Sequence, residues 1–100
     1  MHRNAIIAKL KETEPILRAR GVGALYLFGS YARDEAGPDS DVDLFVDPAS
    51  GGHFGFLNYM DAYEAIRRAI GSEVEIGYST RDGLSRHVRP NVEREAIRIF

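Results

Sequence analysis

The chain has 100 residues, 44% of them hydrophobic, which is enough for one small globular domain with a single core over residues 1–100. Its formal net charge of −2 argues against binding along a nucleic-acid backbone. The sequence contains no cysteine, so disulfides and thiolate chemistry are excluded, and it has no apolar signal segment or membrane-length run. We therefore expect a cytoplasmic protein without nucleic-acid or membrane partners.

The N-terminal half begins with a helical pattern and continues into a strand. Residues 2–20 have helical spacing, which Pro15 kinks or restarts because proline lacks an N–H donor, and Gly21 ends the pattern. The apolar, aromatic run 24–28 predicts a buried strand. The dipeptide 29–30 then stops the strand and opens a short helical stretch.

The remaining pattern alternates strands and helices. Residues 41–46 and 73–78 alternate with the period of strands, and residues 54–70 form a helix whose apolar face begins at Phe56. A further helix is expected to start at Pro90. This order predicts an α/β fold, in which a small mixed sheet of three or more strands is covered by helices mainly on one face.

The turn after the first strand has the composition of a phosphate-binding turn. Gly29 has no Cβ, so phosphate oxygens can approach the main chain, and Ser30 can cap the helix or donate its hydroxyl. Backbone N–H groups at such a helix start point toward an anion. A glycine and a serine after a strand also occur in ordinary turns, and this alternative stays open.

Two aspartates share one face of the next predicted strand. Side chains alternate along a strand, so Asp41 and Asp43 lie together, opposite the apolar residue Val42. At about 4 Å and an effective dielectric near 20, two such charges repel by roughly 4 kcal/mol, which a divalent cation would cancel. Mg²⁺ suits this pair because it takes carboxylate and phosphate oxygens. The alternative is a solvated strand edge with two surface acids.

A third carboxylate is expected from the strand at 73–78. Glu73 and Glu75 lie on the face opposite its apolar residues, and Glu73 stands at the solvated start of the strand. If this strand pairs beside the strand of Asp41 and Asp43, Glu75 completes a cluster of three acids. The alternative is that Glu75 is only a surface residue.

Taken together, these motifs are more specific than any of them alone. The chain resembles the nucleotidyltransferases of the DNA polymerase β superfamily, and in particular the minimal branch that is often encoded beside HEPN-domain toxins. The resemblance covers most of residues 20–80. It is carried by Gly29-Ser30, Ala32-Arg33, Ser40-Asp41-Val42-Asp43-Leu44 and Gly71 followed by Val74-Glu75-Ile76.

The resemblance implies roles for the acids and for the turn. Gly29 and Ser30 would bind the phosphates of a nucleoside triphosphate. Asp41 and Asp43 would bind two Mg²⁺ ions, and Glu75 would be the third metal-binding and catalytic acid, beside the attacking hydroxyl.

Two further residues would contact the nucleotide. The resemblance implies that Arg33, one helical turn after Ser30, faces the phosphates, to which its planar fork is suited. Ser40 belongs to the same nucleotide-binding set. The alternative for Arg33 is a surface ion pair with a nearby acid, namely Asp34, Glu35 or Asp39.

The sequence departs from the family pattern at two positions. Glu75 stands where the family usually has aspartate, which puts the geometry of the base in doubt because the side chain is one methylene longer. Asp34 stands where the minimal branch commonly has glycine after Ala-Arg, and it could reshape the loop and repel phosphate.

The expected function is Mg²⁺-dependent transfer of a nucleoside monophosphate, AMP from ATP, to a hydroxyl. For the minimal branch the resemblance implies that the acceptor is a tyrosine of a cognate HEPN ribonuclease toxin, which makes this chain an antitoxin. One alternative is an antitoxin with weak or no catalysis that neutralises the toxin by direct binding. Another is modification of a small molecule such as an aminoglycoside. Homo- and hetero-oligomers are both compatible with the sequence.

Overall fold

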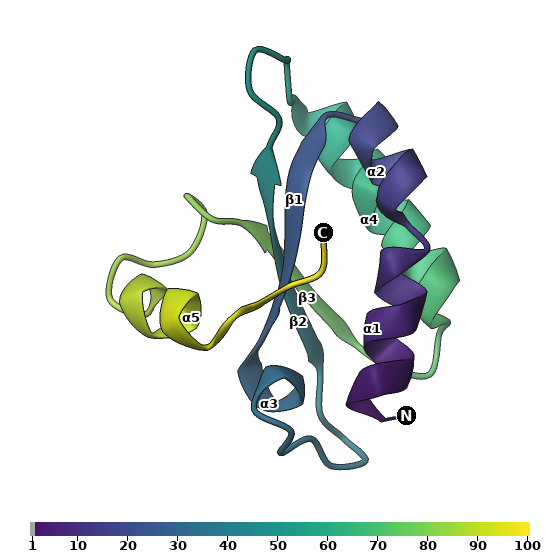
Figure 1. Cartoon of the computed structure of the whole chain (residues 1–100), viewed down its shortest axis with the longest axis vertical. Coiled ribbons are helices and arrows are strands. Elements are labelled where there is room, and N and C mark those ends of the chain that lie inside the picture. The colour runs from purple at the N-terminus through teal and green to yellow at the C-terminus, as the bar shows by residue number, and fades with distance from the viewer. Residues whose placement is uncertain (1) are drawn as a thin grey trace.

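The structure is a computed structural model that describes residues 2–100, and it is an α/β fold built on one four-stranded sheet (Figure 1). The elements, in chain order, are α1 (Arg3–Lys11), α2 (Glu14–Ala19), β1 (Val22–Phe28), α3 (Gly29–Ala32), β2 (Val42–Pro48), α4 (Phe56–Ile70), β3 (Ile76–Thr80), α5 (Arg89–Glu95) and β4 (Ile97–Arg98).

The sheet is mixed, as the sequence predicts, and its strand order is β3-β2-β1-β4. Strand β1 runs antiparallel to both of its neighbours, β2 and β4. Strands β2 and β3 are parallel, with Val42 beside Ile76 and Asp43 beside Gly77. The parallel pair needs a crossover connection, which α4 supplies. The three strands expected from the sequence are confirmed, whereas β4 has no counterpart in that prediction.

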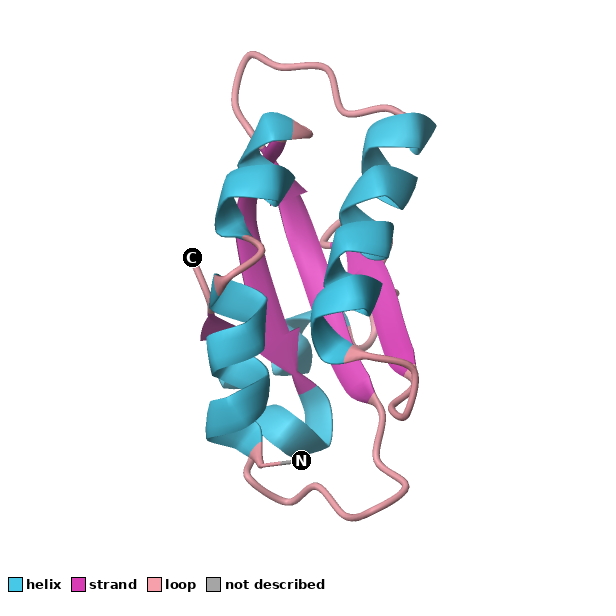
Figure 2. Cartoon of the chain, turned by 90° about the vertical axis from the view of Figure 1, so that its right-hand side faces the viewer, coloured by secondary structure: helices cyan, strands magenta, loops and turns pink. Residues whose placement is uncertain are grey.

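Helices α1, α2 and α4 cover one face of the sheet, and the core lies between them and the strands (Figures 1 and 2). Strand β2 supplies fully buried Val42, Leu44 and Val46 to this layer. Ile6 of α1 and Ile66 of α4 pack against the same cluster and are also fully buried. The predicted placement of helices mainly on one face is therefore confirmed, and the other face of the sheet remains more open.

Helix α5 lies on this other face, and one arginine attaches it there. Arg81, directly after β3, pairs with Asp47 of β2 at 2.9 Å and with Glu93 of α5 at 2.5 Å. Its guanidinium carbon also lies 5.0 Å from the ring centroid of Tyr26 and 4.9 Å from that of Phe45. This arginine covers the aromatic side chains of the open face and joins them to α5.

The structure settles one boundary that the sequence left open and corrects another. The N-terminal pattern forms two helices, and Pro15 stands in the first turn of α2, where a missing N–H costs nothing. Strand β3 starts at Ile76 instead of residue 73, because the carbonyl of Val74 accepts hydrogen bonds from the Arg67 side chain of α4 at 2.5 and 2.8 Å. The described part of the chain contains no helix of the length and apolarity that a membrane crossing requires.

Helix α4 also differs from its prediction at its first residue. Its buried positions Ala62, Ile66 and Ile70 recur every four residues and form the stripe that faces the sheet. Phe56, which the sequence pattern assigned to the apolar face, does not fit this spacing and is 74% exposed. The prediction for Phe56 was therefore wrong.

Candidate active site

Asp43, one of the predicted acids, lies on the open face of the sheet, because β2 has two chemically different sides. Val42 and Leu44 are buried under the helices, and side chains alternate, so Asp43 between them faces the opposite way. Fully buried Phe45 anchors that second face by stacking on Tyr26, with ring centroids 4.6 Å apart. The apolar side of β2 therefore fixes the position of the Asp43 carboxylate.

The Asp43 carboxylate lies in a cradle formed by two glycines. Gly29 follows β1, and Gly77 is the register partner of Asp43 on β3. A Cβ at residue 77 would lie 2.7 Å from Oδ1 of Asp43, and a Cβ at residue 29 would collide with Oδ2. Gly29 also has a φ of +76°, which side chains rarely adopt. Both positions require glycine so that this carboxylate can lie close to the backbone.

The electrostatics of the site show an acid whose charge Arg33 compensates only in part. Burial raises the pKa of Asp43 above its usual value, and the nearby Asp41 carboxylate raises that pKa further. The Arg33 guanidinium lowers the same pKa, while Glu95 raises it. A half-buried carboxylate held next to another carboxylate is a suitable ligand for a divalent cation, so the pair Asp41 and Asp43 fits the predicted metal.

Asp41 and Glu75 lie just before β2 and β3 and are neighbours across the parallel pair. The N–H of Val42 donates to the carbonyl of Glu75 at 2.9 Å, and the strand register continues from there. Asp41, Glu75 and Ser40 line one shallow hollow of about 150 Å³. Glu75 is exposed, and within residues 2–100 no three histidine or acidic side chains are gathered closely enough to hold a metal ion.

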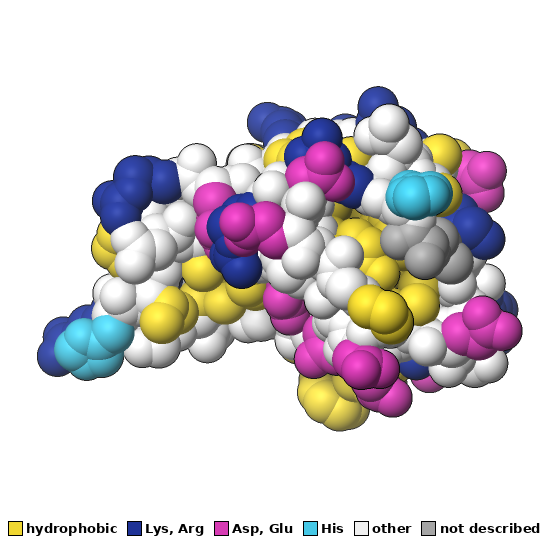
Figure 3. Space-filling view, turned by 90° about the horizontal axis from the view of Figure 1, so that it is seen from below, with side chains coloured by type: hydrophobic (Ala, Val, Ile, Leu, Met, Phe, Trp, Pro, Cys, Tyr) yellow, Lys and Arg dark blue, Asp and Glu magenta, His cyan; other side chains and the backbone are white. Residues whose placement is uncertain are grey.

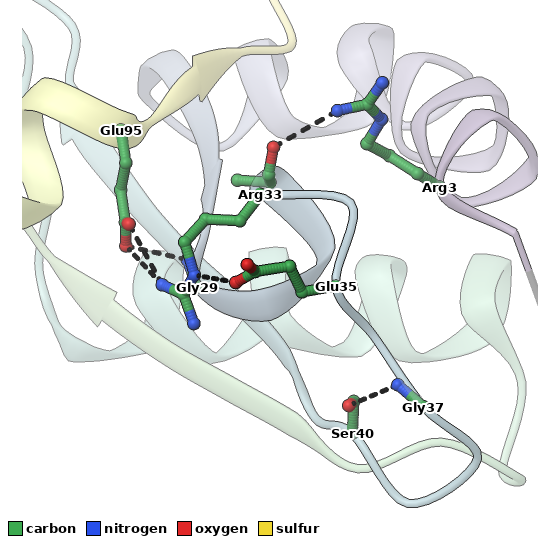
Figure 4. A network of polar contacts seen from close by, with 8 residues as sticks. Arg3, Gly29, Arg33, Glu35, Gly37, Ser40 and Glu95 are labelled. Atoms are coloured by element: carbon green, nitrogen blue, oxygen red, sulfur yellow. Dashed lines mark hydrogen bonds and ion pairs between the residues drawn. The ribbon is translucent and has the colours of Figure 1, made fainter.

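Ser40 lies apart from the phosphate-binding turn (Figure 4). Its hydroxyl oxygen accepts a hydrogen bond from the N–H of Gly37 at 2.8 Å and so stabilises the loop before β2. The structure thus divides the predicted residues into two groups. Asp43 lies with Gly29 and Arg33, and Ser40 and Glu75 lie around the hollow. Asp41 belongs to both groups, because it lines the hollow and its charge also acts on Asp43.

The turn itself is α3, and its capping bears on the role of Ser30. Phe28 occupies the N-cap and no side chain caps the helix, so capping, one of the two roles considered for Ser30, is not the role it has here. The N–H of Gly29 donates to Oε1 of Glu95 at 3.2 Å. The predicted anion-binding donor therefore contacts an anion, but this anion is a carboxylate of the same chain.

Arg33 reaches back over this turn and binds two acids (Figure 4). Its Nε donates to Glu35 at 2.8 Å, and its Nη1 donates to the two oxygens of Glu95 at 3.2 and 2.9 Å. The hydrogen bond to Glu35, and then that to Glu95, raise the pKa of Arg33. Sequence reasoning considered Glu35 as a partner but missed Glu95, which lies 62 residues away.

Asp34, the second departure from the family pattern, has a special backbone conformation. Its φ is +60°, the left-handed region, and it is the one non-glycine residue of the described chain with a positive φ. Glycine adopts this conformation without steric cost, and aspartate tolerates it better than most residues. The position after Arg33 thus has the geometry for which glycine is the usual choice.

The end of the molecule that contains α3 and the loop before β2 has mixed charge. The view from below shows acidic side chains lying next to basic ones across this end (Figure 3). Arg33 is the cation that approaches Asp43, while Asp41 and Glu95 add negative charge there. A triphosphate would therefore need cations that accompany it in order to bind beside these acids.

Comparison with known proteins gives the family of this fold and site. The family model for a nucleotidyltransferase domain matches residues 10–99. The chain is 31% identical to protein adenylyltransferase MntA from Thermococcus cleftensis, over 88% of this chain and 93% of that protein. A solved structure provisionally described as a minimal nucleotidyltransferase is 30% identical, covers 97% of this chain and 95% of its own, and has a TM-score of 0.79.

A crystal structure of a toxin-antitoxin with AMP-PNP shares the fold at 18% identity and a TM-score of 0.64, covering 100% of this chain and 73% of its own. The chain belongs to the nucleotidyltransferase domain family and is an enzyme of that class. Within the class it is a minimal nucleotidyltransferase, as its motifs predicted.

Proposed function

We propose that this chain transfers AMP from ATP to a tyrosine hydroxyl of a HEPN-type toxin and so acts as its antitoxin. In this proposal Asp41, Asp43 and Glu75 are the metal-binding and catalytic acids. The observation that carries it is the Asp43 carboxylate, which is held in a glycine cradle beside Arg33 and the α3 turn. The adenylyl group and the protein acceptor are suggested by the activity named for MntA, the 31% identical relative.

The metal-binding part of the proposal rests on the carboxylate pair. Asp41 and Asp43 would hold two Mg²⁺ ions together with the triphosphate, and Glu75 would add a third carboxylate from the neighbouring strand. Bound Mg²⁺ supplies charge neutralisation for the phosphates and lowers the pKa of an acceptor hydroxyl. The raised pKa of Asp43 favours the proposal, because it marks a site where a cation relieves repulsion.

The remaining residues would bind and orient the nucleotide. Arg33 would contact phosphate oxygens, Gly29 and Ser30 would form the turn against which they lie, and Ser40 would shape the loop beside them. In the transfer, the acceptor oxygen bonds to the α-phosphorus while the bond to the bridging oxygen of pyrophosphate breaks. A site carboxylate, Glu75 in this proposal, accepts the hydroxyl proton.

A protein acceptor fits the shape of the site better than a small molecule. The hollow at Asp41 and Glu75 measures about 150 Å³, below the range of about 300–1,000 Å³ that is typical of small-molecule pockets. An aminoglycoside would find few walls here. A partner protein can instead supply its own wall around the base and the attacking hydroxyl.

The test is a transfer assay with the protein encoded by the adjacent gene as the acceptor. The chain is incubated with this protein, Mg²⁺ and each of the four ribonucleoside triphosphates, and mass spectrometry measures the acceptor. We expect a gain of one or more AMP units on tyrosine with ATP, lost in Asp41→Asn. Asp61→Asn is the matched control, because Asp61 lies on α4, on the helix-covered side, and is exposed. No modification by any nucleotide would overturn the proposal.

A second candidate is neutralisation of the toxin by stoichiometric binding. It is favoured by one observation, namely that no three acids are gathered into a metal site within residues 2–100. In that case Asp41→Asn and the chelator EDTA would leave toxin inhibition unchanged, and inhibition would require equimolar chain. Catalytic antitoxin would instead act at substoichiometric amounts and would need Mg²⁺.

A further inference from the structure

Glu95 ties together both ends of the predicted phosphate-binding turn. Its Oε1 accepts hydrogen bonds from the N–H of Gly29 at the start of α3 and from Nη1 of Arg33 just after the end of α3, both at 3.2 Å. Its Oε2 accepts a third bond from the same Nη1 at 2.9 Å. The Glu95 side chain is only 26% exposed, so these bonds are partly shielded from water. Figure 4 shows the carboxylate facing both donors.

The sheet explains why Glu95 reaches this place. Strand β4 is antiparallel to β1, with Ile97 opposite Leu27. Continuing this register by two residues sets Glu95 opposite Gly29. Helix α5, whose last residue is Glu95, also carries Glu93, which forms a partly exposed ion pair with Arg81. The register between β1 and β4 therefore places Glu95 beside the turn.

The turn needs such external contacts because α3 is a single helical turn. It has four residues, and isolated helices shorter than about 12 residues are marginal in water. No side chain caps its start, and Gly29 has the conformational freedom of glycine. A second external contact is the bond from Arg3 Nη1 to the carbonyl of Ala32 at 3.2 Å. Glu95 is the contact that fixes the orientation of both Gly29 and Arg33.

We propose that Glu95 is a positioning residue of the nucleotide site, which holds Gly29 and Arg33 in the arrangement that receives the phosphates. This inference rests on the proposed function. Glu95 binds Nη1 of Arg33, and Glu35 binds Nε. Within residues 2–100, no hydrogen bond uses the third nitrogen of the guanidinium group, Nη2. Its two N–H groups thus stay available for a phosphate oxygen. Glu95 acts through Arg33 and Gly29 and contacts no reacting atom.

Glu95 could also have the opposite effect and weaken nucleotide binding. The direction in which its removal changes ATP binding therefore distinguishes the two effects. A carboxylate on phosphate-binding donors is also a competitor for them, and its charge repels phosphate. If competition dominated, removing Glu95 would strengthen ATP binding. If positioning dominates, as we infer, removing Glu95 weakens ATP binding because the turn loses its fixed shape.

The first experiment uses the nucleotide-free chain and needs no activity. Amide hydrogen exchange of Gly29 is measured by NMR in the wild type, Glu95→Ala and Glu93→Ala. Glu93 is the matched control, because it also lies on α5 and pairs with an arginine, but has no bond to the turn. We expect exchange at Gly29 to accelerate about tenfold in Glu95→Ala alone. Unchanged exchange in Glu95→Ala would overturn the inference.

The second experiment measures AMP transfer by the same variants. In Glu95→Ala, we expect KM for ATP to rise about tenfold, with a smaller change in kcat. Glu95→Gln should lie between Glu95→Ala and the wild type, because its amide oxygen still accepts the Gly29 N–H. Glu93→Ala should keep the wild-type KM. A KM equal to or below the wild-type value in Glu95→Ala and Glu95→Gln would overturn positioning.

A failure of the proposed function and a failure of the role of Glu95 give different results. A wild-type chain that neither binds nor transfers any nucleotide contradicts the proposed function, and the Gly29 exchange result then decides by itself whether Glu95 holds the turn. A wild-type chain that transfers AMP, with Glu95→Ala equal to it in KM and in exchange, contradicts only the role of Glu95.

Discussion

Asp43 on β2 lies in the space that a side chain at Gly77 on β3 would fill. The two residues are register partners in the parallel pair, and Oδ1 of Asp43 is 2.7 Å from the position of a Cβ at residue 77. Side chains of register partners leave the sheet on the same side, so only glycine gives the carboxylate room to lie across β3. The exact residue type at 77 is therefore part of the site, although residue 77 has no chemistry of its own.

Gly77→Ala should displace the Asp43 carboxylate. We expect a loss of nucleotide transfer of about tenfold or more and a fall of about 1–3 kcal/mol in the free energy of unfolding, because the methyl group overpacks a fixed contact. Steady-state kinetics and chemical denaturation measure the two effects. Gly37→Ala is the control, since a Cβ there has no neighbour within 4 Å. If Gly77→Ala and Gly37→Ala had the same transfer rate and the same free energy of unfolding, Gly77 would not be needed to make room for the Asp43 carboxylate.

Asp43→Asn should stabilise the metal-free chain near neutral pH. Folding raises the pKa of Asp43 above its ordinary value, mainly through burial and then through Asp41. The stability that this residue contributes is complete below the unfolded pKa and is lost as pH rises through the folded pKa. Asn carries no charge, so the gain in melting temperature should be largest near pH 7 and should shrink as pH falls toward 3.8.

This pH dependence is measured by thermal unfolding of both proteins in the presence of EDTA. Added Mg²⁺ should raise the melting temperature of the wild type more than that of Asp43→Asn, because binding to the folded state stabilises it. A melting temperature for Asp43→Asn below that of the wild type near pH 7 would contradict the direction of the pKa shift.

Asp34→Gly should raise the free energy of unfolding by up to about 1 kcal/mol. Asp34 has a φ of +60°, and a left-handed conformation costs a side chain about 1–2 kcal/mol, which exceeds the entropic cost of glycine of about 0.5–1 kcal/mol. Asp39→Gly provides the control, because Asp39 lies in the same loop without a positive φ, and there glycine should destabilise. Urea denaturation of both variants measures the difference.

Arg81→Ala should destabilise the chain by about 1–2 kcal/mol. The arginine lies over two aromatic rings at about 5 Å and forms two partly exposed ion pairs, and each of these four contacts contributes at most about 1 kcal/mol. Denaturant unfolding checks this value. Arg68→Ala should change stability by less than about 0.5 kcal/mol, because Arg68 is exposed on α4. If Arg81→Ala lowered the free energy of unfolding no more than Arg68→Ala does, the contacts of Arg81 with the two rings and the two acids would contribute nothing to stability.

Much of this architecture follows from alternation in the sequence. Along β2, apolar Val42 and Leu44 and acidic Asp43 have the period of a strand, so both the buried face and the position of the carboxylate could be predicted. The family motifs around Gly29 gave the nucleotidyltransferase fold. These features depend on residues close to one another in the chain.

Contacts between distant segments could not be predicted. Strand β4 has two residues, too few for any alternation to be visible, yet its register sets Glu95 opposite Gly29. Sequence could mark Asp34 as unusual, but only the backbone shows its positive φ. Phe56 stands in a sequence with the apolar spacing of a helix. Its exposure depends on where α4 begins relative to the sheet, which the sequence does not show.

The small volume of the hollow beside Asp41 also has a consequence for inhibitor discovery. At about 150 Å³ it cannot enclose a purine ring with its sugar, so compounds that imitate adenine alone should gain little affinity from this chain. Chelating compounds that present acidic oxygen groups together with a metal offer a better starting scaffold. Selectivity between related enzymes would then have to come from the exposed surface around Glu75.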